Sequence, residues 1–209
     1  ELLDTAQIRY ELLDKDSSIC CGRPMMLSGQ TEAAKQLIET NKKQIKDSGA
    51  KVLVTSCPIC YRIFKDDYNL EIEVLHHSQY LLRLIEQGRI QVNKADMPVV
   101  YHDPCEVSRK ASPIYEEPRK LIEKVAELRP VKEEKDKALC CGGSLANHHL
   151  PSAKRKKVAS DALQRINPDA HTLITSCPLC KKTFGGVSEG EVLDLAQLIV
   201  ISLKKENQS

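Results

Sequence analysis

Eight of the nine cysteines form two copies of one motif, a Cys-Cys-Gly triplet followed at a distance by Cys-Pro-x-Cys. The first copy is Cys20-Cys21-Gly22 with Cys57-Pro58-Ile59-Cys60, and the second is Cys140-Cys141-Gly142 with Cys177-Pro178-Leu179-Cys180. The copies are offset by a constant 120 positions, and the residues from 52 to 56 before Cys57 repeat at 172 to 176 before Cys177. Thiolates bind metal centres and exchange electrons. The pattern therefore indicates a duplicated thiolate site.

The ninth cysteine, Cys105, stands ahead of the second Cys-Cys pair. A counterpart in the first copy would fall before Glu1, so we expect that the first site has lost its leading ligand. We also expect that the sequence is an N-terminally shortened piece of a longer protein. The second site then has five cysteines and the first site has four.

Metal binding is favoured over a disulfide framework. Adjacent cysteines seldom bond to each other, because the geometry of a disulfide is demanding. A chain of 209 residues can also bury enough core to fold without such cross-links. The sequence contains neither a secretion leader nor an apolar run of about 18 residues. We therefore expect a reducing, cytoplasmic compartment with the thiolates on metal, and no membrane span in this chain.

The charge balance argues against a nucleic-acid partner. The chain has 31 Lys and Arg against 29 Asp and Glu, a formal charge of +2. With two Phe, six Tyr and no Trp, it also has few rings on which bases could stack. The basic run Lys154-Arg155-Lys156-Lys157 is interpreted as a solvated helix face, with docking of an acidic electron-transfer partner or of nucleic acid as alternatives.

The apolar pattern predicts helices that alternate with strands in both halves. Helices are expected at 31–47, 78–87, 114–128, 152–165 and the C-terminus, and strands at 51–55, 71–76, 98–102, 171–175 and 191–194. Gly49 should end the first of these helices, and Pro151 should begin the helix that starts at 152. The β-branched strand 51–55 should be buried on both faces.

This alternation predicts an α/β fold of two tandem similar domains, 1–94 and 95–209, each a mainly parallel sheet flanked by helices. The polar stretch 91–97 is the expected boundary between them. The charged stretch 131–137 is expected to be an exposed loop.

Each Cys-Pro-x-Cys begins directly after a predicted buried strand, where ligand sites gather in open α/β sheets. The proline suits the first turn of a helix, whose free N–H groups and dipole lower the pKa of a nearby thiol. Gly22 and Gly142 supply the backbone freedom that two neighbouring thiolates need to reach one centre.

The number of ligands separates the possible metals. Structural zinc takes four protein ligands, so the five cysteines of the second half favour an iron–sulfur cluster, which has several irons. The first half is compatible with zinc, with an ordinary four-iron cluster, or with a defective version of the second site. The five second-half ligands are Cys105, Cys140, Cys141, Cys177 and Cys180, and the four first-half ligands are Cys20, Cys21, Cys57 and Cys60.

Three stretches carry a family resemblance: Tyr101-His102-Asp103-Pro104-Cys105, Cys140-Cys141-Gly142-Gly143 and Ser176-Cys177-Pro178-Leu179-Cys180. They resemble the cysteine-rich, Cys-Cys-Gly domain family, which includes the B and D subunits of heterodisulfide reductase. It also includes iron–sulfur subunits of glycolate, lactate and anaerobic glycerol-3-phosphate oxidation. The resemblance covers nearly the whole chain, but the first half lacks the leading Cys. In addition, Ser144-Leu145-Ala146-Asn147 replaces further glycines, which is expected to alter access to the site.

The resemblance implies a noncubane 4Fe-4S cluster on the five cysteines of the second domain, and a second iron–sulfur cluster or zinc in the first. It further implies an oxidoreductase subunit that passes electrons to a disulfide or similar two-electron acceptor within a complex. One alternative is an electron relay between a flavin dehydrogenase and a quinone or other carrier, and another is a zinc-stabilised interaction module. The implied partners are ferredoxin-like or flavin-containing redox subunits and a small thiol or disulfide, with membrane association only through partner subunits.

Several other residues are interpreted individually. His102, at a predicted strand end, is a candidate for proton transfer, and Asp103-Pro104 is interpreted as the turn that positions Cys105. The pairs His76-His77 and His148-His149 are expected to be solvated or satisfied by local hydrogen bonds, with ligation or proton donation near the clusters as the alternative. Met25 and Met26 are expected to pack rather than to ligate.

Overall fold

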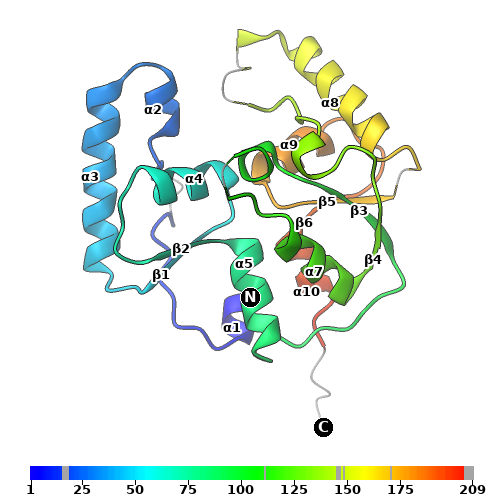
Figure 1. Cartoon of the computed structure of the whole chain (residues 1–209), viewed down its shortest axis with the longest axis horizontal. Coiled ribbons are helices and arrows are strands. Elements are labelled where there is room, and N and C mark those ends of the chain that lie inside the picture. Colours follow the sequence, from blue (N-terminus) through cyan, green and yellow to red (C-terminus); the bar gives the residue numbers. More distant parts are fainter. Residues whose placement is uncertain (16–18, 111, 145–146, 148, 170, 205–209) are drawn as a thin grey trace.

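The computed structural model describes residues 1–15, 19–110, 112–144, 147, 149–169 and 171–204. Helices and parallel strands alternate along the chain and form two sheets (Figure 1), so the predicted α/β class is confirmed. No helix in these ranges is both long enough and apolar enough to cross a membrane.

The larger sheet belongs to the second half and has four parallel strands. Its spatial order is β4 (Glu127–Arg129), β3 (Pro98–His102), β5 (Thr172–Thr175) and β6 (Val192–Asp194). Because the strands are parallel, their carboxyl ends meet at one edge of the sheet, where His102 pairs with Thr175 and Thr175 with Asp194.

The smaller sheet belongs to the first half and has two parallel strands, β1 (Val52–Thr55) and β2 (Glu73–His76). Thr55 pairs with His76 in β1 and β2 just as Thr175 pairs with Asp194 in β5 and β6. The register therefore makes β1 equivalent to β5 and β2 equivalent to β6, which confirms the duplication read from the sequence.

The helices connect and cover these strands. Those of the first half are α1 (Leu2–Thr5), α2 (Arg23–Leu27), α3 (Thr31–Asp47), α4 (Pro58–Asp66) and α5 (His77–Glu86). Those of the second half are α6 (Cys105–Ser108), α7 (Glu116–Val125), the 3-10 turn η1 (Lys135–Lys137), α8 (Ser152–Ile166), α9 (Pro178–Gly185) and α10 (Leu195–Ile201).

Helices lie on both faces of the larger sheet, because its buried strands alternate their side chains between two apolar layers. Val99 and Tyr101 of β3 pack with α7 and α10, whereas Val100 of the same strand packs with α8 and α9. Figure 1 shows α8 and α9 on one side of this sheet and α7 and α10 on the other.

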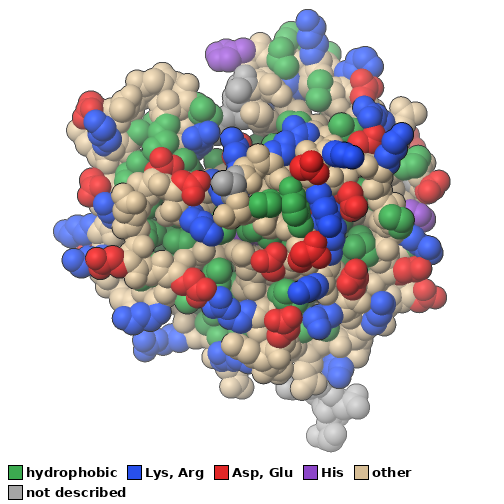
Figure 2. Space-filling model, viewed as in Figure 1, with side chains coloured by type: hydrophobic (Ala, Val, Ile, Leu, Met, Phe, Trp, Pro, Cys, Tyr) green, Lys and Arg blue, Asp and Glu red, His purple; other side chains and the backbone are tan. Residues whose placement is uncertain are grey.

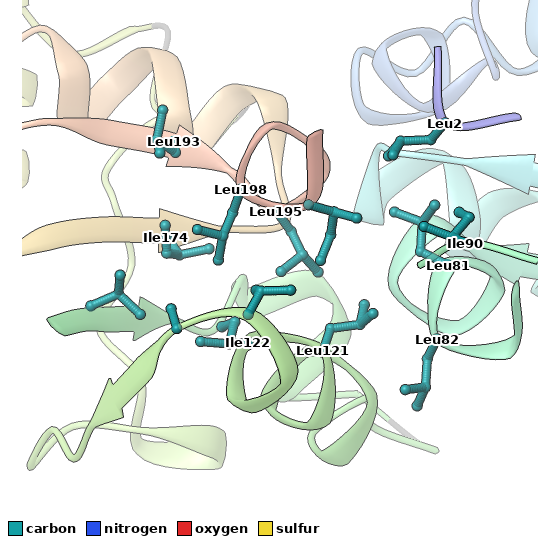
Figure 3. Packing of buried hydrophobic residues seen from close by; sticks show 14 of the residues in the cluster. Leu2, Leu81, Leu82, Ile90, Leu121, Ile122, Ile174, Leu193, Leu195 and Leu198 are labelled. Carbon is teal, nitrogen blue, oxygen red and sulfur yellow. The ribbon is translucent and has the colours of Figure 1, made fainter. Parts of the chain in front are cut away.

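One apolar core joins the two halves. Leu81 and Leu84 of α5 belong to the same buried cluster as Leu121 of α7 and Leu198 of α10. In Figure 3, residues of α1 and α5 approach those of α7 and α10 across a continuous apolar contact. The stretch 91–97, expected as a boundary, is tied to the end of the chain, since the Asn93 N–H donates to the Ser202 carbonyl at 2.8 Å. The division into 1–94 and 95–209 stays a prediction.

The helix predicted at 114–128 is shorter in the structure, and this part of the prediction was wrong. The helix α7 ends at Val125, Ala126 is extended with φ −150° and ψ 178°, and the next residues form β4. Pairing with β3 at the edge of the sheet overrides the local helical pattern, because the ladder supplies the backbone hydrogen bonds.

The prediction that strand 51–55 is buried on both faces was also wrong. All four residues of β1 are half-buried, whereas Leu173 and Ile174 of the equivalent β5 are fully buried. The reason is that β5 lies between two strands, while β1 pairs only with β2 among the described residues.

Two smaller expectations also need correction. Pro151 is the N-cap residue of α8, one position before the first helical turn where it was expected. The stretch 131–137 is not a freely exposed loop, because it contains η1 and its backbone is anchored by the Lys135 N–H, which donates to Asp103 at 2.9 Å.

Candidate metal centre

The Cys-Pro-x-Cys motifs stand where the sequence placed them, at the carboxyl ends of β1 and β5. Cys57 is the N-cap residue of α4 and Cys177 is the N-cap residue of α9, each followed by proline in the first helical turn. The Sγ of Cys177 accepts the N–H of Cys180 at 3.5 Å. This contact confirms that free N–H groups of the first turn face the thiol.

In the second half all five predicted cysteines come together. Their thiols form a chain of side-chain hydrogen bonds that runs in the order Cys105, Cys140, Cys141, Cys180, Cys177. Cys105 comes from the start of α6, the next two from the loop before α8, and the last two from the start of α9. Five thiols from three separate segments therefore meet at one edge of the larger sheet.

The contacts make the five thiols unequal. Hydrogen bonds from Cys105 and Cys141 lower the pKa of Cys140, and its Sγ also accepts the Gly142 N–H at 3.4 Å. A hydrogen bond with Cys180 lowers the pKa of Cys177, and the same kind of contact with Cys141 and Cys177 raises the pKa of Cys180. The pKa is therefore lowered at Cys140 and Cys177 and raised at Cys105, Cys141 and Cys180.

The Cys-Cys-Gly corner requires its glycines, as predicted. Gly142 has φ +79° and Gly22 has φ +92°, a region that side chains with a Cβ rarely adopt. A Cβ on Gly142 would also lie 2.9 Å from Val158 Cγ1 of α8, and one on Gly143 would lie 2.5 Å from Thr183 Oγ1 of α9. The second corner is thus enclosed by α8 and α9.

The first half brings together three of its four cysteines. The thiol of Cys60 contacts those of Cys21 and Cys57, and these hydrogen bonds lower the pKa of Cys57 to about 6 and of Cys21 to about 7. The same contacts raise the pKa of Cys60. No contact of the Cys20 thiol with these three is seen in the described part of the chain.

Two side chains that sequence reasoning missed hold the first Cys-Cys pair in place. Asn41 Nδ2 of α3 donates to the Cys20 carbonyl and to Tyr68 Oη, both at 2.8 Å, and Tyr68 Oη donates to the Cys21 carbonyl at 3.2 Å. Asn41 is 4% exposed although it lies in a helix whose other polar residues face solvent. An asparagine in register with the apolar face of that helix was the available signal.

In the second half, His102 holds the segment that contains Cys140 in place. Its Nε2 donates to the Leu139 carbonyl at 2.9 Å, directly before Cys140, and its Nδ1 accepts from Thr175 Oγ1 at 3.3 Å. The ring is buried beside Phe184, and this burial lowers the pKa of His102. Both ring nitrogens are therefore occupied by hydrogen bonds that place the Cys140 segment, and the predicted proton-transfer role stays a prediction.

The turn Asp103-Pro104 positions Cys105, as predicted, with help from a buried ion pair. Asp103 is 1% exposed and binds the Arg119 guanidinium through both carboxylate oxygens, at 2.9 and 2.7 Å. Pro104 is the N-cap residue of α6, so Cys105 begins that helix. A bidentate pair of this kind fixes orientation as well as distance.

The two cysteine sites lie beside each other. A negative charge on Cys57 partly offsets the lowering of the Cys177 pKa, and the carboxylate of Glu106 partly offsets the lowering of the Cys57 pKa and adds to the raising of the Cys105 pKa. Between the sites, His76 of the first half is hydrogen-bonded at 3.1 Å to the backbone carbonyl of Ser176. The carboxyl ends of the two sheets therefore face each other.

The remaining residues singled out in the sequence fall into place as follows. His76 is buried and makes a local hydrogen bond with Ser78 Oγ at 2.8 Å, which is one of the two expected states. His77 is buried without a hydrogen-bond partner among the described residues, so the expectation was wrong for this residue. His149 is exposed, and His148 lies outside the described residues. Met26 packs against the core of the first half, as predicted. Lys154, Lys156 and Lys157 are exposed, and Lys and Arg side chains gather around α8 at the top of Figure 2.

Among the described residues, no three or more His, Cys, Asp or Glu side chains have the geometry of a site for one metal ion. The five thiols of the second half interact with one another in pairs. This donor set suits a centre with several metal atoms better than a lone zinc ion, which takes its four ligands in a tetrahedron.

The cysteine-rich domain family, known by its CCG motif, matches residues 1–65 and 99–185. The chain belongs to this family. Both matched segments of the cysteine-rich domain contain one complete Cys-Cys-Gly and Cys-Pro-x-Cys set, so the duplication and the family agree.

Curated members related to this cysteine-rich chain are redox proteins. The B subunit of fumarate reductase (CoM/CoB) from Methanothermobacter marburgensis is 29% identical over 203 residues, which cover 90% of this chain and 40% of the relative. The D subunit of dihydromethanophenazine:CoB--CoM heterodisulfide reductase from Methanosarcina acetivorans is 29% identical over 87% of this chain and 47% of the relative. The EtfAB:quinone oxidoreductase of Syntrophomonas wolfei is 24% identical over 95% of this chain and 30% of the relative. The chain spans less than half the length of these relatives.

Proposed function

We propose that the chain is an iron–sulfur redox subunit of the heterodisulfide reductase type, which delivers electrons to a disulfide or a similar two-electron acceptor. The observation that carries this proposal is the meeting of Cys105, Cys140, Cys141, Cys177 and Cys180 at one sheet edge. The family match and the relation to one of the heterodisulfide reductase subunits support it.

The cofactor that we propose for the second half is a noncubane 4Fe-4S cluster on these five thiols. Five thiolates exceed the four ligands of structural zinc, whereas a cluster with several irons can use an extra one. The first half would hold a second iron–sulfur cluster or zinc on Cys20, Cys21, Cys57 and Cys60. When bound, such clusters supply electrons one at a time.

The protein's own groups would prepare the site for this chemistry. Cys57 and Cys177 are the N-cap residues of α4 and α9, and a charge on Cys57 acts on the pKa of Cys177, so two one-electron centres would adjoin one substrate position. Splitting a disulfide consumes two electrons and two protons and yields two thiols, which gives a physical reason for the duplication. His102 would supply or relay a proton through the Thr175 hydroxyl, which it already contacts.

Metal analysis after anaerobic purification tests the proposal. We expect roughly four iron and four sulfide per intact site, and a paramagnetic signal that changes when a thiol substrate is added. Cys105→Ser should change the signal of the second site, while Cys20→Ser should affect only the first. Stoichiometric zinc without iron in the second half would refute the cluster and leave the zinc-stabilised interaction module.

A second candidate function keeps the cluster without the disulfide chemistry. The similarity to EtfAB:quinone oxidoreductase favours an electron relay between a flavin dehydrogenase and a quinone or other carrier. In both functions the partners would be ferredoxin-like or flavin-containing redox subunits in the cytoplasm, with any membrane contact made by those subunits. Disulfide reductase assays of the assembled complex separate the two, because a relay subunit would show no thiol release.

A further inference from the structure

A groove of about 650 Å³ lies where the end of β1 meets α9 and β6. Among its lining residues, Ser56 comes from the first half, and Lys181, Lys182, Asp194 and Gln197 come from the second. Lys182 is exposed, whereas Lys181 Nζ donates to Gln197 at 2.5 Å. The groove is therefore a cationic hollow beside the Cys-Pro-x-Cys motifs of both halves.

The internal repeat has an equivalent surface on α4, and there the surface is covered by other residues of the chain. On α4, Tyr61 is 1% exposed because it packs against Val107 and Ile114 of the second half. The neighbouring Arg62 is 7% exposed, and its Nε donates to the Glu106 carbonyl of α6 at 3.1 Å. The short helix α6 and the chain that follows it therefore cover this face of α4.

The equivalent face of α9 has no such cover among the described residues. The offset of 120 positions relates Tyr61 to Lys181 and Arg62 to Lys182, and the strand registers relate His76 to Asp194. All three second-half residues line the open groove. The groove is thus the counterpart of the surface that α6 occupies on α4.

A free sheet edge accompanies the groove. In the second half, α6 follows β3 through Asp103-Pro104, and β3 pairs with β5. The strand β1 is equivalent to β5, but in the described part of the chain it pairs only with β2. The opposite edge of β1 therefore has no neighbouring strand there, and β1 is half-buried. Such an edge presents N–H and C=O groups that can pair with another strand.

We propose that the groove and the free edge of β1 together bind one polypeptide segment with the strand–turn–helix form of Pro98–Ser108. Its strand would pair in parallel with β1, and its short helix would lie against α9. Lys182 would then donate to backbone carbonyls at the helix end, as Arg62 does to Glu106. The segment belongs to a partner subunit, in keeping with the relatives that are named as subunits, and the proposal stands whether or not the sites bind iron.

Lysine acetylation and amide hydrogen exchange test this directly, with the 209-residue chain alone compared with the same chain in its native assembly. We expect Lys182 to be acetylated roughly tenfold more slowly in the assembly, and the amides of β1 to exchange more slowly by a similar factor. Lys154 and Lys156 of α8, which are exposed, should keep their rates.

Variants sharpen the comparison. Lys182→Glu should weaken assembly, Lys182→Arg should preserve it, and the matched charge reversal Lys156→Glu should leave it unchanged. Equal acetylation of Lys182 and Lys156 in the assembly would overturn the proposal. Protection of Lys182 without protection of β1 would also overturn it, because this result would indicate a small anion in the groove. Protection that appears in the isolated chain together with dimerisation would overturn it too, because this result would indicate that a second copy of the chain is the occupant.

Discussion

His76 donates a hydrogen bond from Nε2 to the backbone carbonyl of Ser176 at 3.1 Å, and this contact links the two halves between their cysteine sites. The carbonyl acceptor fixes the tautomer, so Nδ1 accepts from Ser78 Oγ at 2.8 Å. The histidine is fully buried, and Ser176 directly precedes Cys177. A movement of one half relative to the other would therefore shift Cys177, a candidate metal ligand.

Replacing His76 by Phe should lower the free energy of unfolding by about 1–3 kcal/mol, because the buried Ser176 carbonyl loses its partner. Urea unfolding monitored by circular dichroism measures the change. The exposed His149→Gln is the control and should shift the free energy by less than about 0.5 kcal/mol. Equal effects of the two substitutions would show that the contact does not stabilise the fold.

Stability should fall as the pH drops below about 6.5, the usual pKa of histidine in an unfolded chain. Burial lowers the pKa of His76 and His102, and it lowers the pKa of His77 to about 4. The folded state then binds fewer protons than the unfolded state in this range, so acid favours unfolding. Unfolding free energies measured between pH 4 and pH 8 give the slope.

The variant His77→Leu isolates one of these contributions. Neither ring nitrogen of His77 has a hydrogen-bond partner among the described residues, and the equivalent position in the repeat is the buried Leu195. We expect the substitution to stabilise the protein at pH 5 and to flatten the slope. If the dependence of the unfolding free energy on pH were identical to that of the unchanged chain, His77 would not contribute to it.

Gly142→Ala should be more damaging than Gly22→Ala, although both residues have positive φ. The added Cβ would lie 2.9 Å from Val158 Cγ1 at Gly142 but 3.7 Å from Ile38 Cγ1 at Gly22. Backbone strain alone costs about 1–3 kcal/mol, and the close contact adds to it at Gly142 only. In the double variant Gly142→Ala, Val158→Ala, the part of the lost unfolding free energy that comes from the close contact should be regained. If the effects of the two substitutions are simply additive, the contact does not contribute to the loss.

Asn41→Ala should loosen the first cysteine site without affecting the second. It removes the donor to the Cys20 carbonyl and to Tyr68 Oη, which we expect to cost about 1–3 kcal/mol. Metal content per chain should fall while the spectrum of the second site is retained. The matched control is Asp161→Ala at the repeat-equivalent position on α8, where Asp161 makes an exposed ion pair with Lys157.

Much of the fold followed from the sequence because its signals are local. The helix expected at 31–47 is α3, with Gly49 at φ +65° just beyond its end, and strand 98–102 is β3. By contrast, β4 required knowledge of its pairing with β3, which no local pattern contains. The half-buried state of β1 likewise depends on its number of neighbouring strands.

The candidate site divides in the same way. The nine cysteines and the two glycines were readable from spacing, because thiolates and positive φ values restrict the residue type. The groups that orient them were not: Asn41, Tyr68 and His76 act through contacts with residues 21 to 100 positions away. Such partners depend on how the halves pack, and a single sequence carries no direct record of that packing.

The apolar cluster that joins α5 to α7 and α10 makes the repeat units interdependent. A protease cut within 91–97 would leave two fragments still held together by this cluster, and heat or denaturant should melt both in one cooperative transition. Either fragment produced alone would expose leucines such as Leu84 or Leu121 to water, so the two copies of the ancestral unit can no longer be used as independent building blocks.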